Sequence, residues 1–418
     1  MRILDVYLHG ILVGKLIQDN SGVLSFVYDE AYIQKVGVPA ISISMPVREE
    51  AYEGNKVKAY FSGLLPDDIV RHRLAKYLGV SEKNPFALLE SIGGECAGAL
   101  SLYEQGQTPP VPKDSDIEKL DDKKLREILD LLKRRPLMAG SDDLRLSLAG
   151  AQDKIAVGLK DGDIALVRGA TPTTHILKPL IDNIQDSVHN EVFCMHLAQM
   201  MKIEAPKTEI RWLGDTPYFL IERYDRIIGK DQKIQRLHQE DFCQALSVMP
   251  ELKYEREGGP SVAQCLTLLQ NYSLIPAADR MAFLQRLIFN YLIGNADAHG
   301  KNFSLLYKNN LPVLSPAYDL MCTAIYPNIS TKMAMKIGNK YDPKDLFLRH
   351  WQQIVPDTSA AKKSLEKELH KMAKESLASA NELTTQLAKA GITSTIFKQI
   401  LKVIKERAEH IQDHLFAN

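Results

Sequence analysis

The segment NADAHGKNF at residues 295–303 places Asp297 ahead of Asn302 in a short polar loop, and Asp319 follows two apolar runs further along. A carboxylate in such a loop can accept a proton from an attacking hydroxyl group. A second carboxylate and an amide oxygen can together hold Mg²⁺ against a triphosphate. These residue types suit phosphoryl-transfer chemistry, in which Asp297 would be the catalytic base and Asn302 and Asp319 the magnesium ligands.

The neighbouring elements predict how these residues are brought together. An amphipathic helix is expected over residues 276–293 and leads into the polar loop. Its buried stripe is expected to contain Met281, Leu284, Ile288 and Tyr291. The runs 303–307 and 311–314 predict a hairpin whose two ends meet at one edge. The D-x-x-x-x-N spacing is that of the protein-kinase catalytic loop, although Asp and Asn are also common in ordinary turns.

A second group of residues, in the middle of the chain, could bind a nucleotide. Strands expected at 155–159 and 164–167 flank an Asp-Gly turn and follow a loop of small residues. The small residues in and beside that loop are Ser147, Ala149, Gly150 and Ala151. Their backbone N–H groups could cover phosphates, as a kinase requires, and an ordinary turn before a hairpin is the alternative. The chain has no G-x-x-x-x-G-K-[ST] motif, so a P-loop NTPase is not supported.

Lys178 ends a strand expected at 175–178, in the position along the chain where a kinase holds its phosphate-contacting Lys. Such a Lys usually pairs with a Glu on a nearby helix, and Glu191, on a helix expected over 187–202, is the candidate. The alternatives are a solvated surface Lys and an exposed helix carboxylate.

Another hairpin, expected at 209–212 and 218–222, runs into Glu222 and Tyr224. Chain order places these two residues beside the adenine of a two-lobed kinase. By side chain alone, they are equally well explained as ordinary residues at a strand end.

The bulk properties exclude several classes of protein. The 418 residues include 52 basic and 52 acidic side chains, so overall charge favours neither general nucleic-acid binding nor membrane adhesion. The five scattered cysteines form no C-x-x-C pair, which argues against a zinc knuckle or redox dithiol and fits a reducing cytoplasm. No signal peptide or bilayer-spanning stretch is evident. We therefore expect a cytoplasmic protein of about two or three domains.

The N-terminal third predicts a small sheet followed by helices. Strands are expected at 3–8, 11–17, 22–28 and 41–45, and helices at 61–80 and 85–89. After a Pro-rich polar linker at 105–116 and a helix at 121–134, the later helices are expected at 241–248, 262–272, 347–354, 361–387 and 394–415. Residues 332–337 fit either a strand or a helix. A basic stripe, expected to face the solvent, is formed by Lys362, Lys363, Lys367, Lys371 and Lys374.

Five motifs, in order, together resemble the HipA-type serine/threonine kinases, which are the toxin halves of bacterial toxin–antitoxin pairs. These motifs are SLAGAQDK at 147–154, TPTTHILK at 171–178, ERYDR at 222–226, NADAHGKN at 295–302 and PAYD at 316–319. The resemblance spans nearly the whole chain and includes FSGLLPD at 61–67. It implies an α+β, two-lobed protein-kinase-like fold, with small sheets in an N-terminal α/β lobe and a mostly helical C-terminal lobe.

The resemblance also implies domains and roles for single residues. The implied domains are an N-terminal HipA-type domain at 1–104, a linker and helix at 105–143, a nucleotide-covering part of the small lobe at 144–226 and a helical catalytic lobe at 227–418. The residues implied to bind ATP are Ala149, Gly150, Ala151, Gln152, Asp153, Lys154, Lys178, Glu222, Tyr224, His299 and Lys301. Ser147 is implied to be an autophosphorylated serine that silences the enzyme.

The implied cofactors are ATP and Mg²⁺. The implied partner is a small helix-turn-helix antitoxin of the HipB type, through which the toxin reaches DNA. The implied substrate is a protein, with an aminoacyl-tRNA synthetase such as glutamyl-tRNA synthetase as the family's best-known target. A pseudokinase-like binding module and a small-molecule phosphotransferase of the same fold remain as alternatives.

Overall fold

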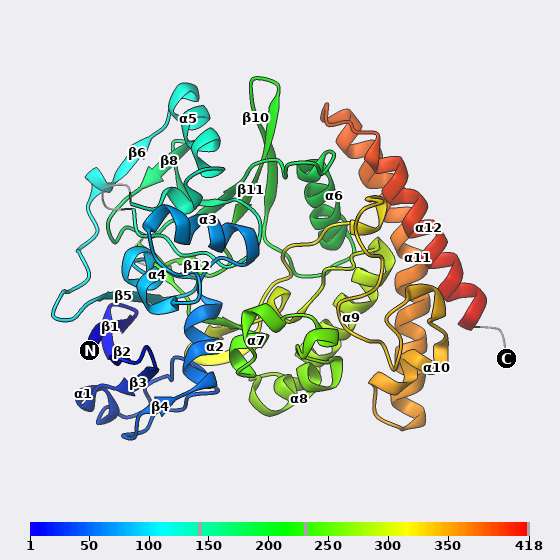
Figure 1. The fold of residues 1–418 in the computed structure, drawn as a ribbon. Coiled ribbons are helices and arrows are strands. Elements are labelled where there is room, and N and C mark those ends of the chain that lie inside the picture. The colour runs from blue at the N-terminus through cyan, green and yellow to red at the C-terminus, as the bar shows by residue number, and fades with distance from the viewer. Residues whose placement is uncertain (141–143, 230–232, 416–418) are drawn as a thin grey trace. The chain divides into compact units, whose positions relative to one another are not determined.

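The computed structural model describes residues 1–140, 144–229 and 233–415 (Figure 1). Packing divides the chain into two units. Unit 1 comprises Met1–Pro179, Arg211–Leu252 and Ser304–Val313, and unit 2 comprises Leu180–Ile210, Lys253–Phe303 and Leu314–Asn418. Residues 141–143, the end of the predicted linker and helix, lie outside the described residues. Unit 1 contains antiparallel sheets and short helices and unit 2 is mostly helical, so the α+β prediction is confirmed.

The first sheet of unit 1 has the strand order β4-β3-β2-β1-β5. Its strands are β1 Arg2–Leu8, β2 Ile11–Gln18, β3 Leu24–Tyr28, β4 Tyr52–Glu53 and β5 Leu100–Glu104. The antiparallel pairing of β1 with β2 and of β2 with β3 confirms the predicted hairpin and third strand. Alternate side chains of β3 are buried, as expected for a sheet with one covered face.

The strand expected at 41–45 is wrong. Among these residues the structure has only an isolated bridge between Ser42 and Met45. The Ser42 hydroxyl donates to Glu240 Oε2 at 2.5 Å, and the backbone N–H of Ile43 donates to Glu240 Oε1 at 3.0 Å. The alternating apolar pattern therefore belongs to a turn that wraps a buried carboxylate, and no sheet partner is needed for its polar groups.

The single helix expected over 61–80 is also wrong, because the helix is interrupted at Pro66. Helix α2 ends at Gly63 and helix α3 begins at Asp68. Proline has no N–H and disfavours helical backbone in the residue before it, so the break falls where Pro66 stands. The helices of this part are α1 Glu30–Ile33, α2 Asn55–Gly63, α3 Asp68–Leu78 and α4 Pro85–Ile92.

The second sheet, which lies in unit 1 apart from residues 208–210, has the strand order β10-β11-β9-β7-β8-β6. Its strands are β6 Ile117–Lys119, β7 Ile155–Lys160, β8 Asp163–Val167, β9 His175–Lys178, β10 Thr208–Leu213 and β11 Thr216–Glu222. The turn between β7 and β8 has positive φ at Asp161 and Gly162, which suits a tight two-residue hairpin. Helix α5, Asp122–Leu132, confirms the helix expected after the linker.

The remaining elements of unit 1 are small. They are β12 Arg226–Ile228, β13 Ile234–Arg236, β14 Gln239–Asp241, β15 Ser304–Lys308, β16 Leu311–Leu314 and α7 Phe242–Ala245. Strands β14, β15 and β16 form one sheet, so the hairpin predicted after the polar loop is confirmed. Helix α7 is shorter than the helix expected at 241–248, and Ser247 has a φ of 58°, outside the helical region.

Glu240, on β14, is buried in unit 1 and is held by neutral donors. Its carboxylate accepts hydrogen bonds from Ser42, Ile43 and the Tyr307 hydroxyl. Burial raises the pKa of Glu240 to about 7, although the hydrogen bonds from Ser42 and Tyr307 act in the lowering direction. The folded protein therefore holds this proton more tightly than the unfolded chain does.

The stability of the protein should consequently contain a term from Glu240 that weakens as the pH rises. Because the folded pKa is raised from 4.5 to about 7, the term is full below pH 4.5 and is lost as the pH approaches 7. Glu240→Gln removes this term, so the stability of the wild type relative to the variant should fall across that window. Urea unfolding of both proteins at several pH values measures the difference, and a difference that stays constant or grows with pH would contradict the assignment.

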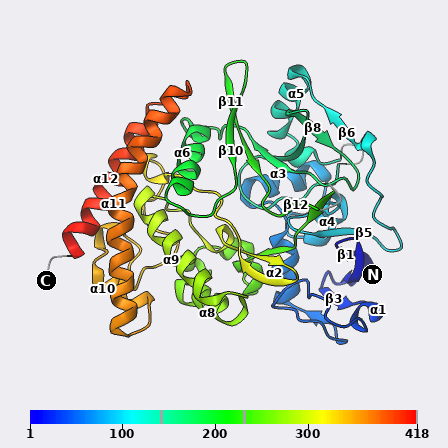
Figure 2. The ribbon, with the colours of Figure 1, turned by 180° about the vertical axis from the view of Figure 1, so that it is seen from behind.

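Helices make up most of unit 2. The α-helices are α6 Ser187–Met200, α8 Val262–Tyr272, α9 Pro276–Ile293, α10 Leu348–Trp351, α11 Ser359–Lys389 and α12 Ile396–Leu415. Helices α11 and α12 lie side by side (Figures 1 and 2). Leu365, Leu369 and Ile400 are buried along them, whereas Lys363, Lys367, Lys371 and Lys374 are exposed as predicted. Residues 332–337 form neither a strand nor a helix.

Single turns of 3₁₀-helix connect the larger elements. They are η1 Asp114–Asp116, η2 Pro136–Met138, η3 Pro250–Leu252, η4 Glu255–Glu257, η5 Gly300–Asn302, η6 Thr323–Ile325, η7 Pro343–Asp345 and η8 Gln352–Ile354. No helix in the described part of the chain is long and apolar enough to cross a membrane.

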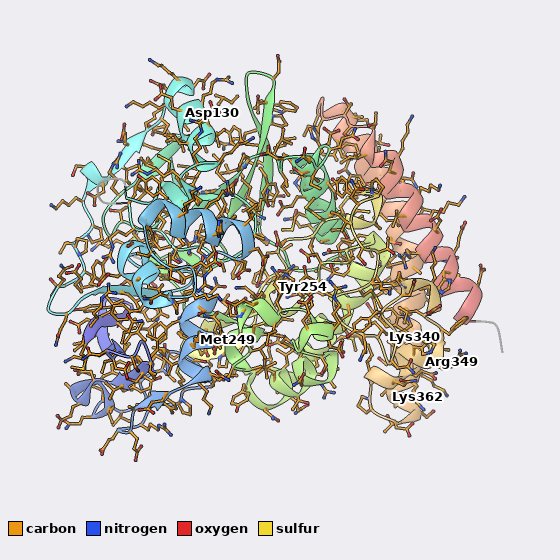
Figure 3. The ribbon with its side chains drawn as sticks, viewed as in Figure 1. Asp130, Met249, Tyr254, Lys340, Arg349 and Lys362 are labelled. Atoms are coloured by element: carbon orange, nitrogen blue, oxygen red, sulfur yellow. The ribbon has the colours of Figure 1, made fainter. Side chains whose placement is uncertain are left out.

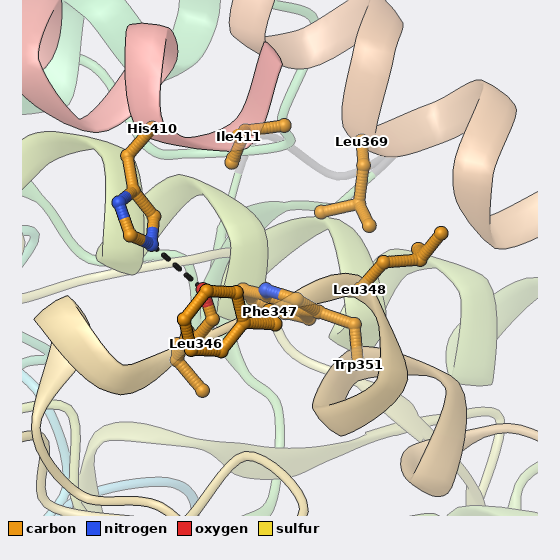
Figure 4. A pocket seen from close by; sticks show the side chains of 7 residues that line it. All are labelled: Leu346, Phe347, Leu348, Trp351, Leu369, His410 and Ile411. Carbon is orange, nitrogen blue, oxygen red and sulfur yellow. Dashed lines mark hydrogen bonds between the residues drawn. The ribbon is translucent and has the colours of Figure 1, made fainter. Parts of the chain in front are cut away.

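A small pocket in unit 2 is lined mainly by apolar side chains from α10, α11, α12 and the residues before α10 (Figure 4). Its lining residues are Leu346, Phe347, Leu348, Trp351, Leu369, His410 and Ile411. The ring of His410 donates a hydrogen bond to the Leu346 carbonyl oxygen at 2.7 Å. The pocket contains none of the predicted site residues.

Candidate active site

Helix α9 delivers the chain into the predicted catalytic loop. Leu284, Ile288 and Tyr291 are buried as expected, but Met281 is 37% exposed and does not belong to the buried stripe. The helix ends at Gly294, whose φ is 70°. A Cβ atom there would meet Val403 at 2.7 Å and Ala324 at 2.8 Å, so both the backbone conformation and the packing require glycine.

Hydrogen bonds within the loop fix the backbone around Asp297. The Asn295 side chain accepts from the Asp297 N–H at 3.0 Å, and its own amide donates to Asn290 Oδ1 at 2.9 Å. Asn302 donates from Nδ2 to the Asp297 carbonyl oxygen at 2.9 Å. Since the amide nitrogen of Asn302 is used inside the loop, its Oδ1 is the atom that could coordinate a cation.

The Asp319 loop is fastened to the catalytic loop on both sides of Asp319. Before it, the Tyr318 hydroxyl donates to the Lys301 carbonyl oxygen at 2.8 Å. After it, Thr323 Oγ1 accepts from the Ala296 N–H at 2.8 Å. Asp319 itself has a φ of 58°, a left-handed conformation that is uncommon outside glycine and that clusters at functional sites. The structure thus brings together the two loops that carry Asp297, Asn302 and Asp319.

Asn190, on α6, supports the Asp319 loop from behind. Its amide accepts from the Cys322 N–H at 2.8 Å and donates to the Cys322 carbonyl oxygen at 3.0 Å. Asn190 is fully buried, and its neighbour Glu191 is 1% exposed, so Glu191 is not an exposed helix carboxylate. The pairing of Glu191 with Lys178 joins residues of different units and stays a prediction.

Asn302 and Asp319 offer an amide oxygen and a carboxylate, which are donor types that Mg²⁺ accepts. Among the described residues, no group of three or more His, Cys, Asp or Glu side chains could hold a metal ion. Mg²⁺ at phosphate-transfer sites takes one or two carboxylates together with substrate phosphates and water. Asn302 and Asp319 match that pattern, because most of the remaining ligands would come from the nucleotide and the solvent.

In unit 1, strand register places Lys178 beside the predicted phosphate loop. Leu177 on β9 pairs with Ile155 on β7, and Ile155 directly follows the loop residue Lys154. The Gln152 side chain donates to the Pro179 carbonyl oxygen at 3.2 Å, which joins the loop to the end of β9. Lys178 is 6% exposed and its ammonium lies 5.5 Å from the centre of the Phe219 ring, so it is not a solvated surface Lys.

The loop at residues 149–154 is held at several points. Lys154 Nζ donates to the Ala149 carbonyl oxygen at 2.7 Å, and the Gly150 carbonyl oxygen accepts from the Asp67 N–H at 3.1 Å. Asp153 pairs with Arg73 at 2.7 Å. Gly150 has a φ of 113°, which only glycine adopts readily. Ala151 is exposed at the tip of the loop.

Ser147 lies just before this loop and is fully buried. Its hydroxyl donates to the Leu64 carbonyl oxygen at 2.7 Å, and its backbone N–H donates to the Glu95 carbonyl oxygen at 2.8 Å. In this conformation a phosphate donor has no access to the hydroxyl, so any modification of Ser147 requires that its segment leave Leu64 and Glu95.

Glu222 and Tyr224 lie at the other end of β9 from Lys178. Glu222 pairs with His175 and Phe219 pairs with Lys178, so the two ends are three residues apart, or about 10 Å at about 3.3 Å per residue. Glu222 is exposed, and the Tyr224 hydroxyl donates to Gln239 Oε1. Glu222, the last residue of β11, is therefore accessible, whereas Tyr224, two residues later, is anchored by its hydrogen bond.

A buried ion network anchors the same segment. The Glu95 carboxylate contacts Arg223 at 3.1 Å and Arg226 at 2.7 Å, and Asp225 contacts Arg223 at 2.8 Å. Thr173 donates to Glu95 at 2.8 Å. Burial alone would raise the pKa values of Glu95 and Asp225, but the facing guanidinium groups outweigh it and lower both. Both carboxylates therefore stay ionised, and the network joins the Glu95 loop to the residues beside Tyr224.

Several residues of the site were missed in the sequence. The Tyr254 hydroxyl donates to Asp297 Oδ1 at 2.5 Å across a sequence separation of 43 residues (Tyr254 is labelled in Figure 3). The partners of Glu95, Asn190 and Thr323 lie 128, 132 and 27 positions away in the sequence. A lone Tyr, Asn or Thr has no local pattern that distinguishes a site residue, so only the fold identifies them.

Comparison with known proteins agrees with this architecture. The model of the HipA-like C-terminal domain matches residues 146–383, and that of the HipA N-terminal domain matches residues 4–103. The Sinorhizobium fredii protein Y4mE, whose name describes it as a kinase, is 43% identical over 361 residues. The match covers 85% of this chain and 86% of that protein. The serine/threonine-protein kinase toxin HipA of Shewanella oneidensis is 28% identical over 361 residues, covering 82% and 80%.

A solved structure gives the same fold. The structure of the Shewanella oneidensis HipA, HipB and operator DNA complex matches with a TM-score of 0.83 at 23% identity, and the match covers 99% of this chain and 100% of that one. At this identity the match bears on the fold alone, and it agrees with a kinase-like α+β architecture. The two domain models and the relative at 43% identity establish the family. The chain therefore belongs to the HipA family of kinases.

Proposed function

We propose that the protein is an ATP- and Mg²⁺-dependent serine/threonine protein kinase and the toxin of a toxin–antitoxin pair. The observation that carries the proposal is the binding of the Asp319 loop to the catalytic loop through Tyr318 and Thr323. This arrangement suits a base and two magnesium ligands acting on one nucleotide. Family membership supports the same reaction.

The proposed roles follow from the chemistry of each side chain. Asp297 accepts the proton of the attacking hydroxyl group, a role worth about 10²- to 10⁴-fold in rate. Asn302 and Asp319 would hold Mg²⁺, which when bound neutralises charge on the triphosphate. His299 and Lys301, in the same loop, would contact the nucleotide phosphates.

The residues of unit 1 would bind the nucleotide itself. Lys178 would contact the phosphates at one end of β9, and the loop at 149–154 would cover them. Glu222 and Tyr224 would flank the adenine at the other end, where the backbone after β11 offers donors and acceptors. The separation along β9 suits a ligand with an anionic end and a heteroaromatic end.

The proposed partners are proteins. A small helix-turn-helix antitoxin of the HipB type would bind the toxin and connect it to DNA, and the Shewanella oneidensis protein of the same fold is found in a complex with HipB and operator DNA. The proposed substrate is a protein of translation, with an aminoacyl-tRNA synthetase such as glutamyl-tRNA synthetase as the first to test.

Incubation with γ-labelled ATP, cell lysate and a panel of metabolites tests the proposal. Transfer of label to a protein, lost in Asp297→Asn, is the expected result. Label in a small molecule alone would instead support a small-molecule phosphotransferase. ATP binding without any transfer would support a pseudokinase-like binding module, which the intact Asp297, Asn302, Asp319 and Lys178 argue against.

Autophosphorylation at Ser147 is a further expectation of this function. A phosphate adds about −1.5 to −2 charge, which next to the loop at 149–154 should repel ATP and prevent the serine from returning to its buried position. Mass spectrometry after incubation with Mg-ATP should find phosphate on Ser147 in the wild type but not in Asp297→Asn. An unmodified Ser147 in protein that phosphorylates itself elsewhere would rule the site out.

A further inference from the structure

The segment 253–255 connects the catalytic loop with the residues that follow the Asp319 loop. The Lys253 carbonyl oxygen accepts from the Gly300 N–H at 3.3 Å, and the Glu255 N–H donates to the Ala334 carbonyl oxygen at 3.1 Å. The Glu255 carboxylate accepts from the Lys336 N–H at 2.6 Å. Tyr254 is therefore held from both sides by backbone hydrogen bonds, all of them within unit 2.

The Tyr254 side chain contacts the catalytic base directly. Its hydroxyl donates to Asp297 Oδ1 at 2.5 Å. Its ring packs edge-on against the ring of His299, with the centroids 5.1 Å apart, and the Arg256 guanidinium lies 5.3 Å from the ring centre. These contacts fix the ring, so the direction of the hydroxyl is set before any substrate binds.

The same contact leaves part of Asp297 accessible. The Asp297 side chain keeps 48% of its surface exposed although Tyr254 binds one of its oxygens. A carboxylate with one oxygen held by a fixed donor has a defined orientation. The Tyr254 hydroxyl therefore restricts the rotamers available to the Asp297 side chain.

We propose that Tyr254 is a positioning residue for phosphoryl transfer, holding Asp297 through Oδ1 in the orientation in which its carboxylate receives the proton of the substrate hydroxyl group. This inference rests on the proposed kinase function and adds a residue to it. In the transfer step the substrate oxygen bonds to the γ-phosphorus, the bond from that phosphorus to the β–γ bridging oxygen breaks, and ADP leaves with that electron pair. The hydroxyl proton goes to Asp297, and Tyr254 keeps its own proton throughout.

The variant Tyr254→Phe removes the hydroxyl and retains the ring that packs on His299. We expect kcat for labelled phosphate transfer from Mg-ATP to protein to fall about tenfold, which corresponds to about 1.4 kcal/mol, with KM for ATP unchanged. Tyr272→Phe is the matched control, because Tyr272 is 48% exposed at the end of α8 and should leave both constants unchanged. Thermal unfolding of the full-length proteins checks that both variants fold.

The outcomes separate this inference from the proposed function. If Asp297→Asn abolishes transfer while Tyr254→Phe matches the wild type in kcat, the positioning role is refuted and the kinase function stands. A folded Tyr254→Phe whose KM rises while kcat is unchanged also overturns the role, since it would then act in nucleotide binding. If the wild type transfers no phosphate, or Asp297→Asn transfers it normally, the kinase proposal itself fails.

Discussion

Replacing Asp297 with Asn should abolish phosphoryl transfer while Mg-ATP still binds. Asparagine has nearly the same shape, and its carbonyl oxygen can still accept the Tyr254 hydrogen bond, but its side chain cannot take up the substrate proton at neutral pH. The expected loss is about 10²- to 10⁴-fold in the transfer rate. Initial rates with labelled ATP, together with calorimetric titration of Mg-ATP, measure the two effects separately.

Two other substitutions provide comparisons for this result. Asp319→Ala should lose transfer and also the magnesium dependence of ATP binding, because it removes the carboxylate assigned to the metal. Asp130→Asn, on the exposed surface of α5 (labelled in Figure 3), should change neither. Transfer by Asp297→Asn at the wild-type rate would remove Asp297 from the mechanism.

Replacing Glu95 with Ala should be the most destabilising substitution in unit 1. It leaves Arg223 and Arg226 buried with one carboxylate fewer, and removal of one partner of a buried ion pair costs about 3–5 kcal/mol. The same change also removes the acceptor of the Thr173 hydrogen bond. Because Glu95 is fixed to the segment beside Tyr224, weaker ATP binding should accompany the lower stability.

The unfolding midpoint in urea or on heating measures this effect. Glu118→Ala is the control, since Glu118 pairs with Lys124 and Arg168 on the surface, where such pairs contribute about 0–1 kcal/mol. Equal midpoints for Glu95→Ala and Glu118→Ala would contradict a stabilising role for the buried network.

Local sequence patterns predicted the elements that position the site. Helices α8 and α9 have the expected bounds. Apolar periodicity identifies both helices, and their starts are marked by the Ser261 cap before α8 and by Pro276 as the first residue of α9. The hairpins that lead to Lys178 and Glu222 were also predicted, since their turns contain Asp-Gly and Gly-Asp pairs. These features depend on residues that are close together in the sequence, so local patterns are sufficient to predict them.

Features that depend on distant residues were not predictable. The alternating residues 41–45 fit a strand by pattern, yet Glu240, nearly two hundred positions later, fixes them in a turn. The contact between Tyr254 and Asp297 likewise depends on how η4 and the catalytic loop pack together. The motifs of the site were identifiable as an ordered set, whereas the residues that hold them in place became evident only in three dimensions.

The proposed function requires Asn302 and Asp319 to hold a divalent cation on a nucleotide that Lys178 also contacts. A crystal structure with a non-hydrolysable ATP analogue and Mn²⁺ tests this requirement. The anomalous signal of manganese gives the position of the metal independently of any assumed ligands. The expected result is a single strong peak within coordination distance of Asn302 Oδ1, the Asp319 carboxylate and the nucleotide phosphates, with Lys178 at the phosphates. A nucleotide bound elsewhere, or a metal peak away from Asn302 and Asp319, would contradict it.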